Sequence, residues 1–156
     1  MASLLIISGL LMALVAGVFL SFSDFVMRGL VQAPAGQGAA GMVGLNRTVY
    51  RSAFMVLLMG FVPGSLALAA LAVWRLEGAA QLAVLSGAGA YLLGVMAVTG
   101  LGNVPMNNRL DALSRRRGAA LDYWPVYAAR WTRLNHLRWT AATFAAAAWL
   151  VAAQLA

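Results

Sequence analysis

Residues 4–22 read LLIISGLLMALVAGVFLSF, nineteen residues without a charged side chain. A helix needs ~20 predominantly apolar residues to cross a bilayer core, so this stretch predicts a transmembrane helix. No basic residue precedes it, and we expect a permanent span, not a cleaved signal peptide. Three more stretches are uncharged, at 53–73, 79–101 and 139–155. The sequence predicts an all-α, integral membrane four-helix bundle, one domain over residues 1–156 with spans near 4–25, 50–75, 79–103 and 131–155.

The composition excludes several classes of protein. Hydrophobic residues make up 63% of the chain and charged residues 10%, whereas soluble domains carry about 25% charged residues. Disordered chains have the opposite composition. The absence of cysteine excludes disulfides, thiolate metal sites and cysteine nucleophiles. The formal net charge is +7, and the basic residues lie between apolar runs. We therefore expect contact with the lipid bilayer and no nucleic-acid partner.

The arginines predict how the spans are oriented. The chain has no lysine, and ten of its eleven basic residues lie in or beside the first and third connecting segments. The second connection holds only Arg75. Because cytoplasmic loops carry an excess of basic residues, we expect a multi-pass protein of the cell (inner) membrane, with loops one and three cytoplasmic and both termini outside. The run Arg115–Arg117 is expected to contact anionic lipid.

Polar residues collect at the helix ends that should face the cytoplasm. Hairpin connectivity brings all four of these ends together, so we predict one shared vestibule there. Polar groups near a membrane core are costly and often mark a functional site. The candidate residues are Asp24, Asn46, Asn103, Asn107, Asn108, Asp111, Tyr127, Trp131, Asn135, His136 and Arg138.

The spacing of these candidates places several of them on shared helix faces. Tyr127, Trp131 and Asn135 are four residues apart and Arg138 follows three later, so all four lie on one face. Asn103, Asn107 and Asp111 are also four apart, but Pro105 leaves open whether Asn103 instead caps a short helix. Structural interpretations remain open as well. The tryptophans are typical of a belt at the membrane interface, and Asp111 could serve only to pair with an arginine.

The candidate residues restrict the chemistry. One histidine and no cysteine argue against a tetrahedral metal site built from protein ligands alone. No cofactor is required in the favoured interpretation, while a metal ion, or a haem with His136 as its axial ligand, stays open. The arrangement most typical of these residues is His136 as general base, with asparagine amides stabilising an enolate-type oxyanion.

Two motifs carry a resemblance to a known family. Gly-Asn-Val-Pro-Met-Asn-Asn-Arg-Leu at 102–110 and Trp-Thr-Arg-Leu-Asn-His-Leu-Arg at 131–138 resemble the anthrone oxygenase-like family of small four-helix membrane proteins. Phe-Ser-Asp-Phe-Val-Met at 22–27 fits it as well. The resemblance implies oxidation of an anthrone to an anthraquinone with molecular oxygen. The positions that match the family are Asn103, Asn107, Asn108, Trp131, Asn135, His136 and Arg138.

Two functional hypotheses follow. The first is an oxygenase for a membrane-partitioned phenolic or quinone-like substrate. In it His136 abstracts a proton, the amides of Asn107, Asn108 and Asn135 hold the oxyanion, and Tyr127 and Trp131 stack on the ring. Arg138 then favours anions. The second hypothesis is a non-enzymatic membrane subunit that binds a lipid, a haem or a protein partner; the small-residue ridges and the arginine-rich inner face favour it, and a homo-oligomer is left open.

Overall fold

The computed structural model describes residues 1–116 and 118–156, and every regular element in that part of the chain is a helix. Three segments have π-helical geometry and one has 3₁₀ geometry. In chain order the elements are α1 (Ala2–Ser21), η1 (Phe22–Val26, π), α2 (Met27–Gln32), α3 (Gln37–Thr48), η2 (Val49–Arg51, 3₁₀), α4 (Ala53–Arg75), α5 (Gly78–Gly89), η3 (Ala90–Ala97, π), η4 (Thr99–Asn103, π), α6 (Val104–Ser114) and α7 (Ala119–Leu155).

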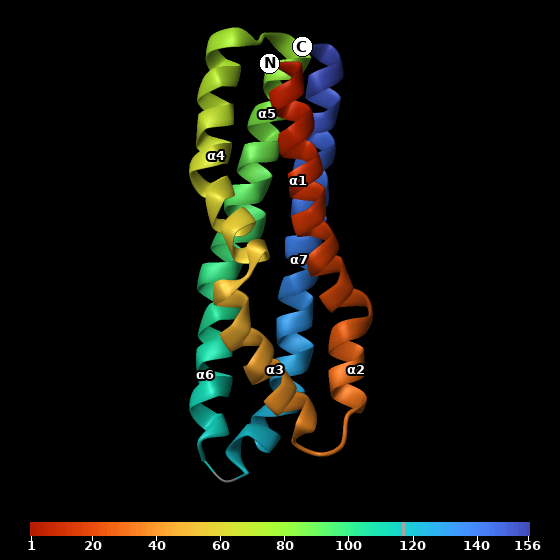
Figure 1. Ribbon diagram of the computed structural model, residues 1–156, viewed down its shortest axis with the longest axis vertical. Coiled ribbons are helices and arrows are strands. Elements are labelled where there is room, and N and C mark those ends of the chain that lie inside the picture. The colour runs from red at the N-terminus through yellow and green to blue at the C-terminus, as the bar shows by residue number, and fades with distance from the viewer. Residues whose placement is uncertain (117) are drawn as a thin grey trace.

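These elements join into four long rods, which confirms the predicted all-helical membrane bundle (Figure 1). Among the described residues, three helices are long and apolar enough to cross a membrane: Ala2–Gln32, Ala53–Arg75 and Gly78–Ser114. The fourth predicted span lies within α7. That helix packs along α1 and α5, but its alanines, threonines and arginines make it less apolar than the other three. The bundle therefore holds one helix with more polar character than a simple membrane span.

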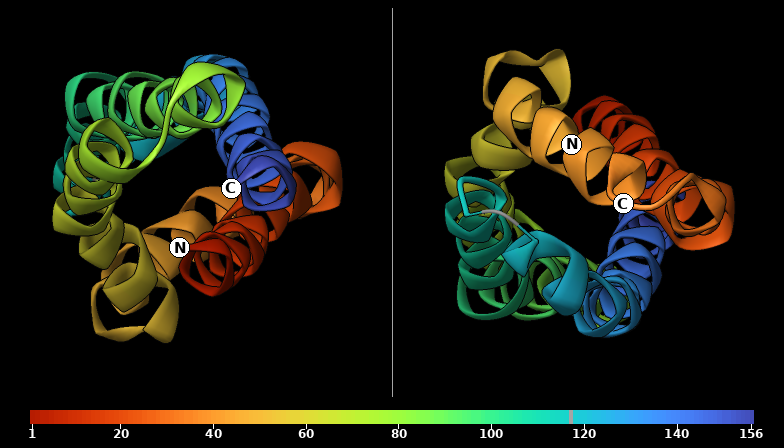
Figure 2. Two further views of the ribbon diagram at one scale, coloured as in Figure 1. Left: turned by 90° about the horizontal axis from the view of Figure 1, so that it is seen from above. Right: turned by 90° about the horizontal axis from the view of Figure 1, so that it is seen from below.

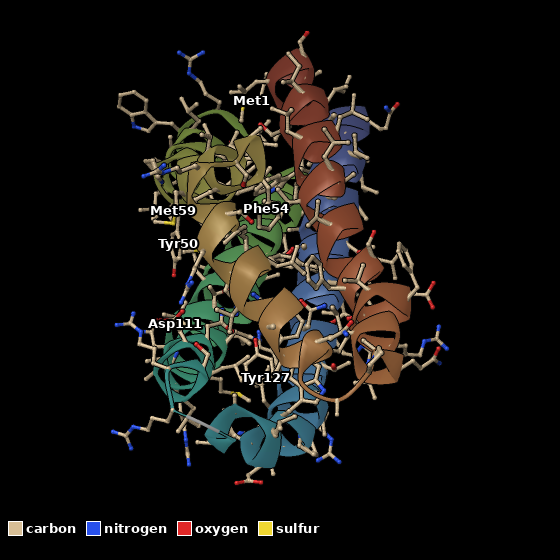
Figure 3. The ribbon with its side chains drawn as sticks, turned by 60° about the horizontal axis from the view of Figure 1, so that its bottom comes forward. Met1, Tyr50, Phe54, Met59, Asp111 and Tyr127 are labelled. Atoms are coloured by element: carbon tan, nitrogen blue, oxygen red, sulfur yellow. The ribbon has the colours of Figure 1, made fainter. Side chains whose placement is uncertain are left out.

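The two ends of the bundle differ in chemistry. Both termini lie at one end, beside the turn between α4 and α5 (Figure 1). The α2–α3 turn and the segment between α6 and α7 lie at the other end. Viewed with its side chains, the molecule has Met1 at the terminal end, and Asp111 and Tyr127 toward the opposite one (Figure 3). We call that opposite end the polar end. Arg117, part of the predicted lipid-anchoring run, lies outside the described residues.

Two helices begin earlier than the sequence predicts. The helix α3 begins at Gln37, ahead of the span expected near 50–75, and α7 begins at Ala119, ahead of the span expected near 131–155. A glycine with positive φ precedes each helix, Gly36 at 84° and Gly118 at 80°. Because glycine adopts this left-handed conformation without steric cost, the chain reverses sharply and starts the helix at once. The early start of α7 brings Tyr127 and Trp131 into one continuous helix with Asn135.

The apolar half of the bundle is held by close packing. Trp149 of α7 is fully buried, stacks on Phe61 at 5.5 Å between ring centroids, and donates a 3.2 Å hydrogen bond to the Val84 carbonyl. A Cβ on Gly9 would lie 2.6 Å from Leu150, so this glycine allows α1 to approach α7. A Cβ on Gly17, two turns further along α1, would meet no atom within 4 Å, so the close approach is at Gly9. Figure 2 shows the four rods surrounding the bundle axis.

Candidate active site

An asparagine on α6 connects three helices near the polar end. Asn107 Oδ1 accepts a 2.8 Å hydrogen bond from Tyr127 Oη and a 2.9 Å bond from Trp131 Nε1, both on α7. Asn46 Nδ2 of α3 donates to Tyr127 Oη at 3.4 Å. The four-residue spacing of Tyr127 and Trp131 lets both polar hydrogens reach the same oxygen. We call Asn46, Asn107, Tyr127 and Trp131 the amide network.

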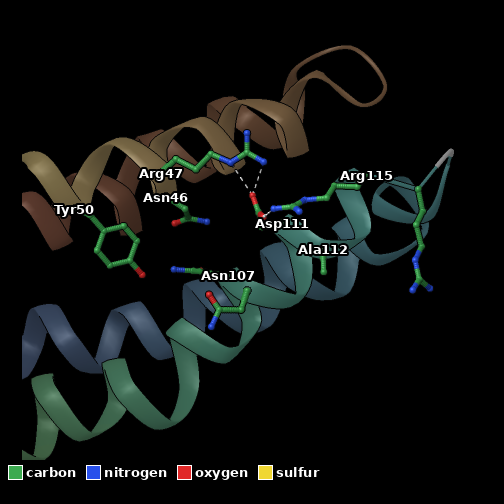
Figure 4. Close-up of a pocket in the computed structure, with 9 residues that line it drawn as sticks. Asn46, Arg47, Tyr50, Asn107, Asp111, Ala112 and Arg115 are labelled. Carbon is green, nitrogen blue, oxygen red and sulfur yellow. Dashed lines mark hydrogen bonds and ion pairs between the residues drawn. The ribbon is translucent and has the colours of Figure 1, made fainter.

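A cavity of about 770 Å³ adjoins this network (Figure 4). Its lining is mostly polar or charged and comes from α3, η2, α6 and the residues that follow α6. Because two donors occupy Asn107 Oδ1, the amide nitrogen of Asn107 is the group left to face a ligand. Among the described residues, that nitrogen has no hydrogen-bond partner. The lining residues are Asn46, Arg47, Tyr50, Asn107, Asn108, Asp111, Ala112, Arg115 and Arg116.

Ion pairs tie α3 to α6 at the rim of this cavity. Figure 4 shows Arg47 reaching from α3 to Asp111 on α6, with Arg115 on the same carboxylate. Arg47 Nη2 lies 2.7 Å from Asp111 Oδ1, and Arg115 Nη2 lies 3.1 Å from Asp111 Oδ2. These groups are exposed or partly exposed, so solvent screens the ion pairs and each contributes little to stability. Asp111 therefore has the pairing role that the sequence left open, and it also lines the cavity.

A second polar centre lies deeper in the bundle, around Arg138. This side chain is only 5% exposed. Its Nη2 donates a 2.7 Å bond to Asn135 Oδ1, and its Nη1 lies 3.4 Å from Thr99 Oγ1. Its guanidinium carbon lies 4.6 Å from the ring centroid of Phe19 and 4.9 Å from that of Trp131. The arginine thus sits between two aromatic rings, a favourable cation–π arrangement.

Asn135 and Asn103 support this deeper centre from separate helices. Asn135 is fully buried and donates to the Phe19 carbonyl at 2.6 Å and to Ser23 Oγ at 2.7 Å. Asn103, 1% exposed, donates to the Trp131 carbonyl at 3.3 Å. Asn103 lies inside a continuous helix and caps nothing with its side chain, so the predicted helical-face placement holds.

The helix geometry changes from α to π beside this centre. Ser23 lies in η1, and Thr99 and Asn103 begin and end η4. A π turn inserts an extra residue, which rotates the following side chains and redirects backbone carbonyls, and it often occurs at functional sites. The structure therefore has irregular helix where Asn135 and Arg138 find their partners.

Most predicted site residues converge, but two do not. His136 is exposed on the side of α7 away from the amide network, and its Nδ1 accepts only a 3.4 Å bond from Trp139 on the same helix. One residue along a helix turns a side chain by about 100°, so His136 leaves the face that Asn135 shares. Asp24 pairs with Arg28 at 2.7 Å on an exposed face. The expected grouping of His136 with Asn107 and Asn108 is thus not found.

Phe19 and Thr99 also belong to the site, although the sequence did not predict either of them. Phe19 has the character of any apolar membrane residue, and the Thr99 hydroxyl also donates 2.7 Å back to the Val95 carbonyl, as helical threonines often do. Their spacing could have indicated them. Phe19 lies four residues before Ser23, and Thr99 lies four residues before Asn103, so each shares a helix face with a polar residue of the site.

Two further features complete the description. Among the described residues, no group of three or more histidine and acidic side chains is placed to hold one metal ion. A groove of about 650 Å³ is lined mainly by apolar residues of α2 and α7, together with Arg28 and Arg133. It does not include the amide network.

Comparison with known proteins gives one match. The sequence model of the family described as anthrone oxygenase matches residues 47–148, which include the amides of α6 and the polar face of α7. No curated protein and no solved structure matches the chain.

Proposed function

Because this chain belongs to the anthrone oxygenase family, we propose that it is a membrane oxygenase that converts a flat phenolic ketone of the anthrone type into the corresponding quinone with molecular oxygen. A family match alone does not fix a reaction. The observation that carries the proposal is the placement of Asn107: it lines the adjoining cavity, and because Tyr127 and Trp131 both donate to its Oδ1, its amide nitrogen is the polar group that remains for a ligand.

The reaction needs a site that favours an oxyanion. Removing a proton from the ring CH₂ opposite the carbonyl of an anthrone gives an enolate, whose negative charge rests largely on the carbonyl oxygen. Oxygen then adds at the deprotonated carbon, a proton returns to the peroxide, and loss of water leaves the second carbonyl. One anthrone and one O₂ give one anthraquinone and one water, so no external reductant is consumed.

Asn107 and Asn108 supply the donors for that oxyanion. Both line the cavity, and fixed amide donors stabilise developing negative charge without reorganising. Arg47 and Arg116 line the same cavity and make it electropositive. Tyr50 offers a flat face along one side. A planar ketone would place its oxygen at Asn107 and its rings beside Tyr50.

The proton leaves by a different route from the one the sequence predicts. His136 does not line the cavity, so a direct transfer to its imidazole has no geometric support. The cavity opens at the polar end of the bundle. We therefore assign the proton to solvent at the cavity mouth, with the acidity of the substrate raised by the amides and the nearby arginines.

The arginine distribution supports a cytoplasmic position for this mouth. With ten of the eleven basic residues in or beside the connections at the polar end, that end would face the cytoplasm of a cell whose inner membrane holds the protein. A hydrophobic substrate would then enter from the inner leaflet, and oxygen, which is apolar, from the lipid around the bundle.

The test is oxygen uptake by purified protein in liposomes supplied with an anthrone. Wild-type protein is expected to form anthraquinone with one O₂ consumed per product. Asn107→Asp keeps an acceptor for Tyr127 and Trp131 but replaces the N–H donors with negative charge, and it should lower kcat/KM by about 100-fold or more. Gln154→Glu, the same change at the terminal end of the bundle, is the matched control and should act like wild type. No uptake on any anthrone, together with co-purification of a stable partner, would instead favour the binding-subunit hypothesis.

A further inference from the structure

Among the residues that the structure describes, Arg138 is a buried cation without an acidic partner. The chain has only four acidic residues. Asp24 pairs with Arg28, and Asp111 pairs with Arg47 and Arg115. The other two are remote. Glu77 precedes α5 at the terminal end, and Asp122 lies sixteen residues before Arg138 on α7, about 24 Å along the helix axis.

A charge in such a place is expensive unless something compensates it. Buried ions are normally paired, and ionisable groups inside membrane bundles usually serve a function. The rings of Phe19 and Trp131 and the oxygens of Asn135 and Thr99 offset part of the cost, but all four are neutral. The centre therefore retains a net attraction for an anion.

Two buried polar atoms beside this centre have no partner among the described residues. Arg138 Nε is an unused donor, and Asn103 Oδ1 is an unused acceptor. Buried polar atoms of this kind are rare and need an explanation. The Nε is the one guanidinium nitrogen of Arg138 left without a partner among the described residues, because Nη1 and Nη2 bind Thr99 and Asn135. A ligand anion would therefore accept its hydrogen bond from Nε.

The indole of Trp131 separates this centre from the cavity at the mouth. On one side its Nε1 bonds to Asn107, which lines the cavity, and on the other its ring faces the Arg138 guanidinium. A planar three-ring ketone beside Tyr50 would have the indole of Trp131 between its rings and Arg138. A two-atom ligand needs far less room than three fused rings. The deeper centre therefore suits oxygen and its reduced forms, not the organic substrate.

We propose that Arg138 forms a binding site for superoxide, with Trp131 between it and the organic substrate. The proposal rests on the oxygenase function above. One electron passes from the substrate enolate to O₂, leaving a substrate radical and superoxide beside the guanidinium. The two then combine to form the C–O bond, the peroxide takes up one proton, and water is lost as the second carbonyl forms. The balance of one O₂ per quinone is unchanged.

Two measurements on the full chain test this site. The first needs no turnover: crystals soaked in sodium bromide should show an anomalous peak within hydrogen-bonding reach of Arg138 Nε, and the peak should vanish in Arg138→Gln. The second is steady-state kinetics with varied oxygen. Arg138→Gln should lower kcat/KM for O₂ by about 100-fold and change KM for the anthrone by less than about threefold. Arg138→Lys keeps the charge, and its kcat/KM for O₂ should be about tenfold higher than that of Arg138→Gln.

The outcomes separate the two proposals. If wild-type protein oxidises an anthrone and Arg138→Gln shows the same oxygen dependence, the superoxide site is wrong and the oxygenase function stands. Loss of anthrone affinity in Arg138→Gln would also overturn the superoxide site, because the positive charge would then bind the organic substrate. If no anthrone is oxidised but bromide binds at Arg138, the oxygenase function is wrong and a buried anion site remains. An Arg138→Gln protein that unfolds in detergent at the wild-type midpoint excludes misfolding as the cause of its lost activity.

Discussion

The indole nitrogen of Trp131 donates a 2.9 Å hydrogen bond to Asn107 Oδ1, across the interface of α6 and α7. The same indole ring lies 4.9 Å from the guanidinium carbon of Arg138. One aromatic side chain therefore contacts both polar centres of the bundle. It orients the amide that faces the cavity, and it covers the buried cation behind it.

Replacing Tyr127 with Phe tests whether Asn107 must be held in place. The change removes the 2.8 Å bond to Asn107 and the partner of Asn46, while the ring stays in the apolar cluster around it. One such bond is worth about 1 kcal/mol, so kcat/KM on an anthrone should fall roughly fivefold, with a small drop in thermal stability. Asn46→Ala should give a smaller decrease, because Asn46 contacts Asn107 only through Tyr127. An unchanged kcat/KM in Tyr127→Phe would show that Trp131 alone positions the amide.

Replacing His136 with Ala should leave activity within about twofold of wild type. The imidazole is exposed and bonds only to Trp139 of its own helix. A general base in contact with substrate would raise the rate of the reaction about a hundredfold or more. Oxygen uptake measured across a range of pH distinguishes the two cases. A hundredfold loss would return the role of base to His136 and require α7 to rotate, or a second copy of the chain to contribute.

The glycine at position 87 is predicted to be essential for packing in the apolar half. A Cβ there would lie 2.6 Å from Trp149 Nε1, which donates to the Val84 carbonyl. Gly87→Ala should destabilise the fold by about 1–3 kcal/mol, since the rigid indole has to move. Gly89→Ala, on the same helix with open space around it, is the control and should be neutral or slightly stabilising. Unfolding in detergent measures both, and equal midpoints would mean that Trp149 repacks freely.

The predicted orientation can be measured with single cysteines, because the natural chain has none. Ala35→Cys lies in the exposed turn between α2 and α3, and Gln154→Cys lies near the end of α7. A maleimide that cannot cross membranes should label Gln154→Cys in intact cells, and should label Ala35→Cys only after lysis. The reverse pattern would place the polar end and its cavity outside the cytoplasm.

The sequence predicts those parts of the site that depend on one continuous helix. Tyr127, Trp131, Asn135 and Arg138 share a buried face because 3.6-residue periodicity fixes their relative directions. Asn103 and Asn107 lie one turn apart on the rod formed by α5, η3, η4 and α6, where Pro105 falls at the junction of η4 and α6. The helical fold follows similarly from the lengths of the uncharged runs.

The remaining features depend on how separate helices meet. In a membrane, lipid is as apolar as the bundle core, so hydropathy does not show which side of α7 faces inward. That is why His136 was grouped with Asn135, its neighbour in the chain. The contacts of Asn107 with Trp131, and of Asn135 with the Phe19 carbonyl, join residues 24 and 116 positions apart. The isolation of Arg138 from every carboxylate became visible only in three dimensions.

The central claim is that the amide nitrogen of Asn107 receives the carbonyl oxygen of a planar aromatic ketone. The most direct test is an experimental structure of the protein with an anthraquinone bound as product. One quinone oxygen is expected about 3 Å from Asn107 Nδ2, with the rings in the cavity beside Tyr50. A quinone bound instead in the groove between α2 and α7, with Asn107 uncontacted, would contradict it.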